Sequence, residues 1–184
     1  MNHKPIIFNT QMVKAILNNS KTQTRRIVNP NLLTNLEWLE DDPNHLYVED
    51  EYGDWNHLLK YAPVNKGDLL WVRETFSKDP NDSFISYRAD YDESFWCRFL
   101  WKPSIFLPKK HARIWLKVTD VRVHRIKRIS KHDAIEEGVK PCMHYPSIYY
   151  FEKLWDSINK DRGYGWDKNP YVWAYTFKKV ERQC

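Results

Sequence analysis

Apolar side chains recur at helical spacing in three places along this chain. After Thr10 they fall on one side of residues 11–18, so we expect a short amphipathic helix with Thr10 as its N-cap. Ser130 and Asp133 have the spacing of a capping box, which predicts a second helix that Gly138 closes. The predicted helices are residues 11–18, residues 131–137 and a segment that begins at Ser147.

Alternating apolar and polar residues predict strands elsewhere. The expected strands are residues 22–28, 69–74, 84–88, 113–123 and 171–180. In the last strand four aromatic residues share one face, and such a face is more often core than a base-stacking platform. These residues are Tyr171, Trp173, Tyr175 and Phe177. We also expect a short helix around residues 32–39.

The order of these elements indicates an α+β fold. Helix, strands, helices and strand follow one another without the βαβ alternation of a parallel sheet. We therefore expect a small, mostly antiparallel sheet or barrel with peripheral helices, in which residues 1–184 form a single domain. Residues 29–66 and 77–108 contain several prolines and turn signals, and we interpret them as two long insertions.

Composition narrows the class of protein. The 184 residues are 42% hydrophobic and 15% aromatic, which is too apolar for a disordered chain. No apolar run approaches the length of a membrane span, and the first residues lack a signal-peptide pattern, so we expect a cytoplasmic protein without a membrane partner. The three cysteines are widely spaced and predict free thiols. With five glycines there is no glycine-rich phosphate loop, and the seven histidines form no metal pattern, so neither cofactor nor metal is expected.

Charge is unevenly distributed along the chain. The net charge is +5, and residues 109–131 hold nine Lys or Arg against one acid, whereas residues 37–54 hold eight acids and no Lys or Arg. Such asymmetry predicts a face that binds nucleic acid, although lysines that protect a strand edge give a similar pattern. The candidate nucleic-acid-binding residues are Lys109, Lys110, Arg113, Arg122, Arg125 and Arg128.

The segment from Ser20 to Arg26 carries the densest candidate chemistry. It packs three hydroxyls and three cations into seven positions. Lys21 and Thr24 are three residues apart, so the amine could take a proton from the hydroxyl, and Arg25 and Arg26 could hold an anion. The same segment also fits an ordinary polar turn with exposed charges, and the spacing by itself does not decide between the two.

Several segments, taken in order, resemble the ASCH domain family, and most closely its longer phage and prophage members. The resemblance covers nearly the whole chain and rests on residues 8–13, 19–26, 67–75, 87–90, 101–105, 134–138 and 164–167, together with the closing aromatic strand. It implies a β-barrel fold similar to that of pseudouridine synthases and archaeosine transglycosylases (PUA-like). It also implies a location in the bacterial host cytoplasm if the protein is phage-encoded.

The resemblance also implies function. ASCH domains are proposed to bind RNA or nucleotides, one bacterial branch hydrolyses the acetyl amide of N4-acetylcytidine, and some relatives are ribonucleases. By position, Lys21 corresponds to the family's base, Thr24 to its nucleophile and Glu137 to its acid. Glu136 stays open as the alternative to Glu137. One departure is Asn19, which stands where the family usually has glycine, although asparagine tolerates the same backbone conformation.

We therefore expect the partner to be RNA or a modified nucleoside, with DNA as a further option and no prediction of oligomeric state. The concrete hypothesis is a hydrolase that cleaves the amide of an N-acylated, cytidine-like base, or a ribonuclease. The expected substrate-binding residues are Arg26, Arg25, Thr22 and Glu74. Two alternatives remain, namely a non-catalytic RNA- or DNA-binding module and a phage protein that binds a host partner through residues 37–54.

Overall fold

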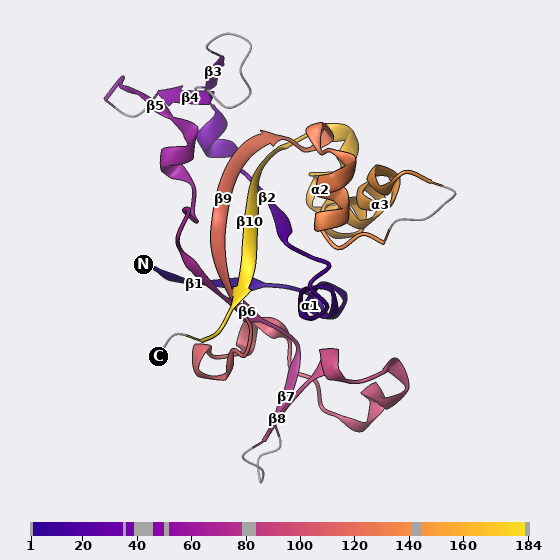
Figure 1. The fold of residues 1–184 in the computed structure, drawn as a ribbon. Helices are drawn as coiled ribbons and strands as arrows, with labels where there is room; N and C mark the ends of the chain where they lie inside the picture. The colour runs from indigo at the N-terminus through magenta and orange to yellow at the C-terminus, as the bar shows by residue number, and fades with distance from the viewer. Residues whose placement is uncertain are drawn as a thin grey trace. The chain divides into compact units, whose positions relative to one another are not determined.

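The computed structural model describes residues 2–34, 36–38, 46–49, 52–78, 84–140 and 145–182. Its elements are short strands, three α-helices and several 3-10 turns, which is the expected α+β class (Figure 1). The chain divides into two compact units. Unit 1 comprises residues 1–22, 67–118 and 177–184, and unit 2 comprises residues 23–66 and 119–176. No described helix has both the length and the apolar composition that a membrane crossing requires.

Unit 1 is built around a parallel strand pair. Its elements are β1 (His3–Ile7), α1 (Thr10–Leu17), β6 (Leu69–Arg73), β7 (Phe76–Lys78), β8 (Ile85–Tyr87), the first part of β9 (Trp115–Arg125) and the last part of β10 (Tyr171–Val180). Strand β1 runs parallel to β6, with His3 opposite Leu69. On its other side β6 pairs antiparallel with β9, so that Trp71 faces Trp115. The sequence pattern missed β1, because two of its five residues are Lys4 and Pro5 and no alternation results.

Unit 2 contains the remaining strands and two helices. Its elements are β2 (Gln23–Ile27), β3 (Leu36–Trp38), β4 (Leu46–Glu49), β5 (Trp55–His57), α2 (Lys131–Glu136), α3 (Ser147–Asn159) and the rest of β9 and β10. Strand β10 pairs antiparallel with β2. A core of apolar residues from β4, β9, β10 and the turn η2 (Leu58–Tyr61) lies on one side of this pair. A second core joins α2 and α3 to Val172 of β10.

The five-stranded sheet has the order β1-β6-β9-β10-β2. Among the described residues this order starts at β1 and ends at β2, so the structure shows a mostly antiparallel sheet and no closed barrel. The predicted aromatic face is confirmed as core, since Tyr171, Trp173, Tyr175 and Phe177 are each at most 3% exposed. The single-domain prediction and the two predicted insertions stay predictions.

Local capping differs from the prediction at one helix and agrees at another. The N-cap of α1 is Asn9, whose Oδ1 accepts a hydrogen bond from the Met12 amide at 2.8 Å, and Thr10 is the first helical residue. At α2 the predicted capping box of Ser130 and Asp133 is present. The helix expected around residues 32–39 is wrong in its described part, because the 3-10 turn Pro30–Leu33 is followed by β3.

Candidate functional site

Strand β2 carries most of the segment that is rich in hydroxyls and cations, and its pleat sorts these residues onto two faces. Thr24 lies directly opposite Tyr175 of β10, so the two side chains share a face. Arg26 follows two residues later on that same face. Gln23 and Arg25 point to the opposite face. The side chains of the adjacent residues Arg25 and Arg26 therefore lie in different environments.

On the Tyr175 face, Arg26 holds the hydroxyl of Thr24. Nη1 of Arg26 donates to Oγ1 of Thr24 at 2.7 Å and to the carbonyl oxygen of Arg25 at 2.9 Å. Thr24 is 1% exposed. Burial lowers the pKa of Arg26, while the charge of Glu137 and the hydroxyl of Tyr175 oppose that shift. Burial has the opposite effect on Tyr175, because it raises the pKa of the phenol. An arginine keeps its proton at neutral pH even when buried, so this guanidinium is a fixed positive charge beside the hydroxyl.

On the opposite face, Arg25 forms a buried ion pair with Glu137. Nη1 of Arg25 lies 3.0 Å from Oε1 of Glu137, and the two side chains are 1% and 4% exposed. Nη2 of the same guanidinium lies 3.3 Å from Oδ2 of Asp133. Glu137 is the residue after α2, so this pair fastens the end of the helix to β2. The sequence led us to expect Arg25 at the substrate, and the structure gives it carboxylate partners within unit 2.

Side chains of α2 extend this network to Gln23 of β2 and Arg122 of β9. Nε2 of Gln23 donates to Oδ1 of Asp133 at 2.9 Å and also to Oε2 of Glu136. Nη2 of Arg122, on β9, lies 3.3 Å from Oδ1 of Asp133. Asp133 thus has contacts with side chains of both β2 and β9. The side chain of Asp133 is 15% exposed and that of Arg122 is 38% exposed, so the network reaches from the interior to the surface of unit 2.

Asp133 is held in its ionised form by these contacts. Burial by itself would raise its pKa, but hydrogen bonds from Gln23 and Ser130 and the charges of Arg25 and Arg122 outweigh burial. The result is a pKa lowered from 3.8 to about 2. A carboxylate that accepts several hydrogen bonds and faces two cations behaves in this way. Asp133 is therefore a permanent anion in unit 2 at neutral pH.

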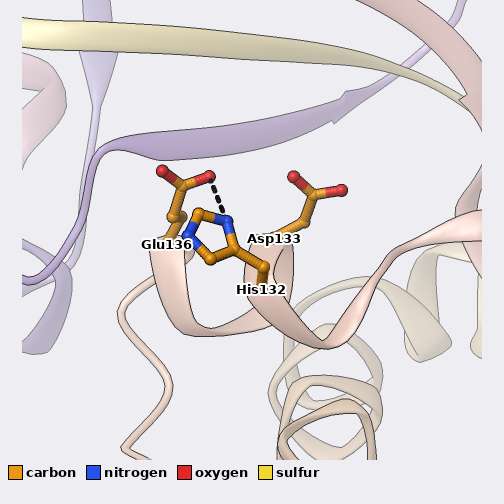
Figure 2. Close-up of side chains that lie close together, drawn as sticks. All are labelled: His132, Asp133 and Glu136. Atoms are coloured by element: carbon orange, nitrogen blue, oxygen red, sulfur yellow. Dashed lines mark ion pairs between the residues drawn. The ribbon is translucent and has the colours of Figure 1, made fainter.

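His132, Asp133 and Glu136 are grouped closely enough to suggest a metal site (Figure 2). One ligand atom from each lies within 4.8 Å of the others, and Nδ1 of His132 is 3.4 Å from Oε2 of Glu136. Asp133, however, already faces the guanidinium groups of Arg25 and Arg122. Two fixed cations beside the central carboxylate oppose a divalent ion. We therefore assign the group to the charge network of α2.

Lys21 and Thr22 belong to unit 1, in the turn between α1 and β2. Asn19 adopts the left-handed conformation with φ of 57°, as expected for an asparagine that ends a helix in a turn. The amide of Lys21 donates to the carbonyl of Ala15 at 3.2 Å, and its Nζ lies 5.7 Å from the centre of the Phe8 ring. Lys21 is 2% exposed. Its convergence with Thr24 and Glu137 stays a prediction.

Glu74, the remaining substrate-binding candidate, is engaged by Arg113 in unit 1. Nε and Nη2 of Arg113 reach the two carboxylate oxygens at 2.8 and 2.9 Å, and Nη1 reaches Asp90 at 2.7 Å. The guanidinium also lies 4.1 Å from the centre of the Tyr87 ring. Burial raises the pKa of Glu74, and Arg113 lowers it in part. The side chain of Glu74 is 1% exposed and that of Arg113 is 28% exposed, so the carboxylate is buried while the guanidinium is partly open to solvent.

The candidate nucleic-acid-binding residues fall into both units. In unit 1, Nζ of Lys109 lies 2.8 Å from Nδ1 of His3, and Lys110 is exposed. In unit 2, the guanidinium of Arg125 stacks 3.9 Å from the centre of the Tyr171 ring, and Arg128 is exposed. Arg113 and Arg122 form the ion pairs described above. Four of the six cations, Lys109, Arg113, Arg122 and Arg125, therefore have partners inside their own unit.

Sequence reasoning missed Gln23, Asp133 and Tyr175. Gln23 shares the strand period of Arg25, and that alternation could have placed both on one face. Asp133 was recognised only as a helix cap, because a local spacing gives no sign of the strand that it meets. Tyr175 was assigned to the core, and it is 2% exposed, yet its hydroxyl has no hydrogen-bond partner among the described residues.

Comparison with known proteins finds solved structures with a similar fold. No protein-family model matches the chain, and no curated protein matches its sequence. A solved ASCH domain from Lactobacillus crispatus has 11% identity and a TM-score of 0.48, and the match covers 98% of this chain and 81% of that chain. An ASCH domain is thus among the structures that this chain is similar to.

A second solved structure is a protein from Enterococcus faecalis of the family DUF984. It has 9% identity and a TM-score of 0.44, with 91% of this chain covered. The match covers 66% of that protein, so this chain spans just under two thirds of its length. At these identities the likeness concerns the fold alone, and the roles of residues have to come from the geometry of this chain.

Proposed function

We propose that the protein binds RNA or a modified nucleoside and hydrolyses the amide of an N-acylated, cytidine-like base, with Thr24 as nucleophile. The observation that carries the proposal is the 2.7 Å hydrogen bond from Arg26 to the Thr24 hydroxyl. Because the guanidinium occupies one lone pair, the proton and the second lone pair of the hydroxyl are confined to the two remaining staggered positions. Fixed orientation of a nucleophile is a large part of what an active site supplies.

The reaction that fits this pair is acyl transfer through Thr24. Oγ1 attacks the acyl carbon, its proton passes to a base, and the carbon–nitrogen bond breaks as the amine leaves with a proton from an acid. Water then hydrolyses the threonine ester, which releases the carboxylic acid and restores the hydroxyl. Arg26 keeps its charge, so it suits the stabilisation of the developing oxyanion and does not suit the role of base. The family resemblance assigns the base to Lys21.

The acid is proposed to be Glu137, with Glu136 as the alternative. Oε1 of Glu137 accepts from the buried Arg25, whereas Oε2 of Glu136 accepts from Gln23 and lies beside the exposed His132. Glu137→Gln and Glu136→Gln remove the two acids one at a time without changing their volume. Because Glu137→Gln also removes the partner of the buried Arg25, turnover is compared at a temperature at which both variants are folded. The variant that loses turnover under these conditions identifies the acid.

Acetate release from N4-acetylcytidine tests the proposed reaction. Thr24→Ser keeps a hydroxyl at the same position and should retain activity, whereas Thr24→Val keeps the shape and should abolish it. Valine matches threonine in shape but lacks the hydroxyl, whereas serine keeps the hydroxyl and lacks one methyl group. Activity that survives in Thr24→Ser and is lost in Thr24→Val therefore reports on the hydroxyl. If wild type and Thr24→Val are indistinguishable across a panel of acylated nucleosides and short RNAs, the catalytic proposal fails.

The alternatives are a non-catalytic RNA- or DNA-binding module and a phage protein with a host partner. Salt separates binding from nucleoside hydrolysis, because the affinity of a polyanion binder falls steeply with salt concentration and the turnover of a small nucleoside does not. A PUA-like fold and a single domain that spans residues 1–184 belong to the same proposal. The proposal also includes a bacterial cytoplasmic location and a role for Thr22 and Glu74 at the substrate. A ribonuclease reaction is its alternative chemistry.

A further inference from the structure

Tyr175 has a buried hydroxyl group whose hydrogen-bonding capacity is not used. The residue is 2% exposed, and its oxygen has no hydrogen-bond partner among the described residues. A phenol buried in this way gives up its hydrogen bonds to water without compensation, which costs stability. Nearly all buried polar side chains in folded proteins have a partner, so an unpartnered one points to a group that binds there.

The pairing of β10 with β2 places this tyrosine beside the proposed nucleophile. Tyr175 is the direct cross-strand partner of Thr24, and opposed side chains of an antiparallel pair share a face with their Cβ atoms about 5 Å apart. Arg26, two residues further along that face, donates to the hydroxyl of Thr24 at 2.7 Å. The positive charge of Arg26 also lowers the pKa of Tyr175 against the effect of burial, so the phenol and the guanidinium are close enough to interact. The three side chains therefore form one group in unit 2.

The protonation state of the phenol limits what it can do. Burial raises the pKa of Tyr175 by more than Arg26 lowers it, so the hydroxyl keeps its proton at neutral pH. It therefore suits a hydrogen-bond donor and does not suit a base. The ring packs in one core with Leu46, Val48 and Leu58. In such apolar surroundings a hydrogen bond to a developing negative charge is stronger than it is in water. Tyrosine is among the side chains that stabilise oxyanions in this way.

We propose that the hydroxyl of Tyr175 binds the acyl oxygen of the substrate and donates a hydrogen bond to the oxyanion that forms there. The inference rests on the proposed hydrolysis and deepens it, since it assigns recognition of the acyl group to a residue of β10. Thr24 and Tyr175 are both at most 2% exposed, so the substrate enters only after neighbouring side chains move. The hydroxyl then has no hydrogen bond to a described residue to break before it meets the substrate.

The step balances without a change in the protonation of Tyr175. As Oγ1 of Thr24 attacks the acyl carbon, one electron pair of the carbon–oxygen double bond moves onto the acyl oxygen. The hydrogen bond from Tyr175 strengthens as this negative charge grows. When the carbon–nitrogen bond breaks, the electron pair returns and the carbonyl re-forms as the threonine ester. The same donor serves again when water attacks that ester.

Tyr175→Phe tests the proposal, because it removes the hydroxyl and keeps the ring. On N4-acetylcytidine kcat should fall about 100- to 1,000-fold, with a smaller change in KM, since the donor acts mainly on the transition state. The midpoint of urea unfolding should be unchanged or higher, because the variant loses a polar group that has no partner in the folded protein. A hydroxyl with a purely structural role would give the reverse result, namely a lower midpoint and an unchanged kcat in the folded protein.

Tyr171→Phe is the matched control. Tyr171 lies on the same face of β10, but its carbonyl accepts from the amide of Val28, four positions along β2 from Thr24. Its kcat should equal that of the wild type. Full kcat in Tyr175→Phe, a clear fall in its urea midpoint, or an equal loss of kcat in Tyr171→Phe would overturn the assignment, while Thr24→Val would still be inactive if the hydrolysis is correct. If the wild type releases no more acetate than Thr24→Val, the hydrolysis fails and the role of Tyr175 fails with it.

Discussion

Arg25 and Glu137 form an ion pair in which both side chains are almost completely buried, with 3.0 Å between Nη1 and Oε1. Removing one partner of such a pair leaves the other charge without compensation in the interior. Glu137→Gln should therefore destabilise the protein by about 2–4 kcal/mol, somewhat less than the usual cost because Asp133 still faces Arg25. Urea denaturation measures the change in the free energy of unfolding.

Lys127 and Asp167 provide the matched control for that experiment. Nζ of Lys127 lies 4.0 Å from Oδ1 of Asp167, and Asp167 is 98% exposed. Exposed pairs contribute little, so Asp167→Asn should leave the free energy of unfolding almost unchanged. Equal effects of the two substitutions would mean that burial does not distinguish the two pairs.

Asp133 should make the protein sensitive to acid. Its pKa in the folded protein is about 2, below the ordinary value of 3.8, so it favours the folded state when it is ionised. This contribution is complete above the unfolded pKa and is lost as the pH falls toward the folded one. After allowance for solvent screening it amounts to ~1–2 kcal/mol. Asp133→Asn should flatten the pH dependence of unfolding below about pH 4. Superimposable curves for the two proteins would contradict the assignment.

Glu74 should give the opposite dependence on pH when its partner is removed. Burial raises its pKa, and Arg113 opposes that shift. In Arg113→Met the pKa should rise further, and a raised carboxyl pKa means that stability is lost as the pH increases through it. We expect a loss of about 2–3 kcal/mol near pH 8 and a smaller loss near pH 5, measured by urea denaturation at both values. A loss that does not change with pH would indicate that packing of the arginine stem is what matters.

Arg26 should be more important for turnover than for stability. Arg26→Lys keeps the positive charge but replaces a planar fork by a single amine, which cannot donate to Thr24 in the same direction. We expect kcat/KM on the proposed nucleoside substrate to fall about 10- to 100-fold. The thermal transition should move little. Full activity in Arg26→Lys would show that the guanidinium has no role in orienting the hydroxyl.

Local signals in the sequence predicted local structure well. The capping box at Ser130 and the strand over residues 171–180 are present as expected, because each depends on neighbours in the chain. Strand β1 escaped prediction because its two polar or cyclic residues, Lys4 and Pro5, interrupt the alternation, and its pairing with β6 is a long-range contact. Strands β3 to β5 were likewise missed inside a segment that was interpreted from its acids and prolines.

The candidate site was predicted only in part, and for a physical reason. The sequence pointed to Thr24, Arg26 and Glu137, but it grouped Arg25 with Arg26 because they are adjacent. Adjacent residues of a strand point to opposite sides, and only the register of β2 against β10 shows which side carries Tyr175 and which carries the carboxylates. Spacing within one element cannot supply that information. The partners of Arg25 come from residues more than a hundred positions away.

The alternation of β2 also makes this strand intolerant of insertions. A single residue added in the turn at Asn19 and Ser20 could be absorbed there, but one added within residues 23–27 would rotate everything beyond it by half a turn. An insertion between Gln23 and Thr24, for example, would bring Arg26 to the anions of α2 and Arg25 to the aromatic side of β10. Length changes among natural relatives should accordingly collect before this strand or after it, and a library of one-residue insertions would show a sharp gap across these five positions.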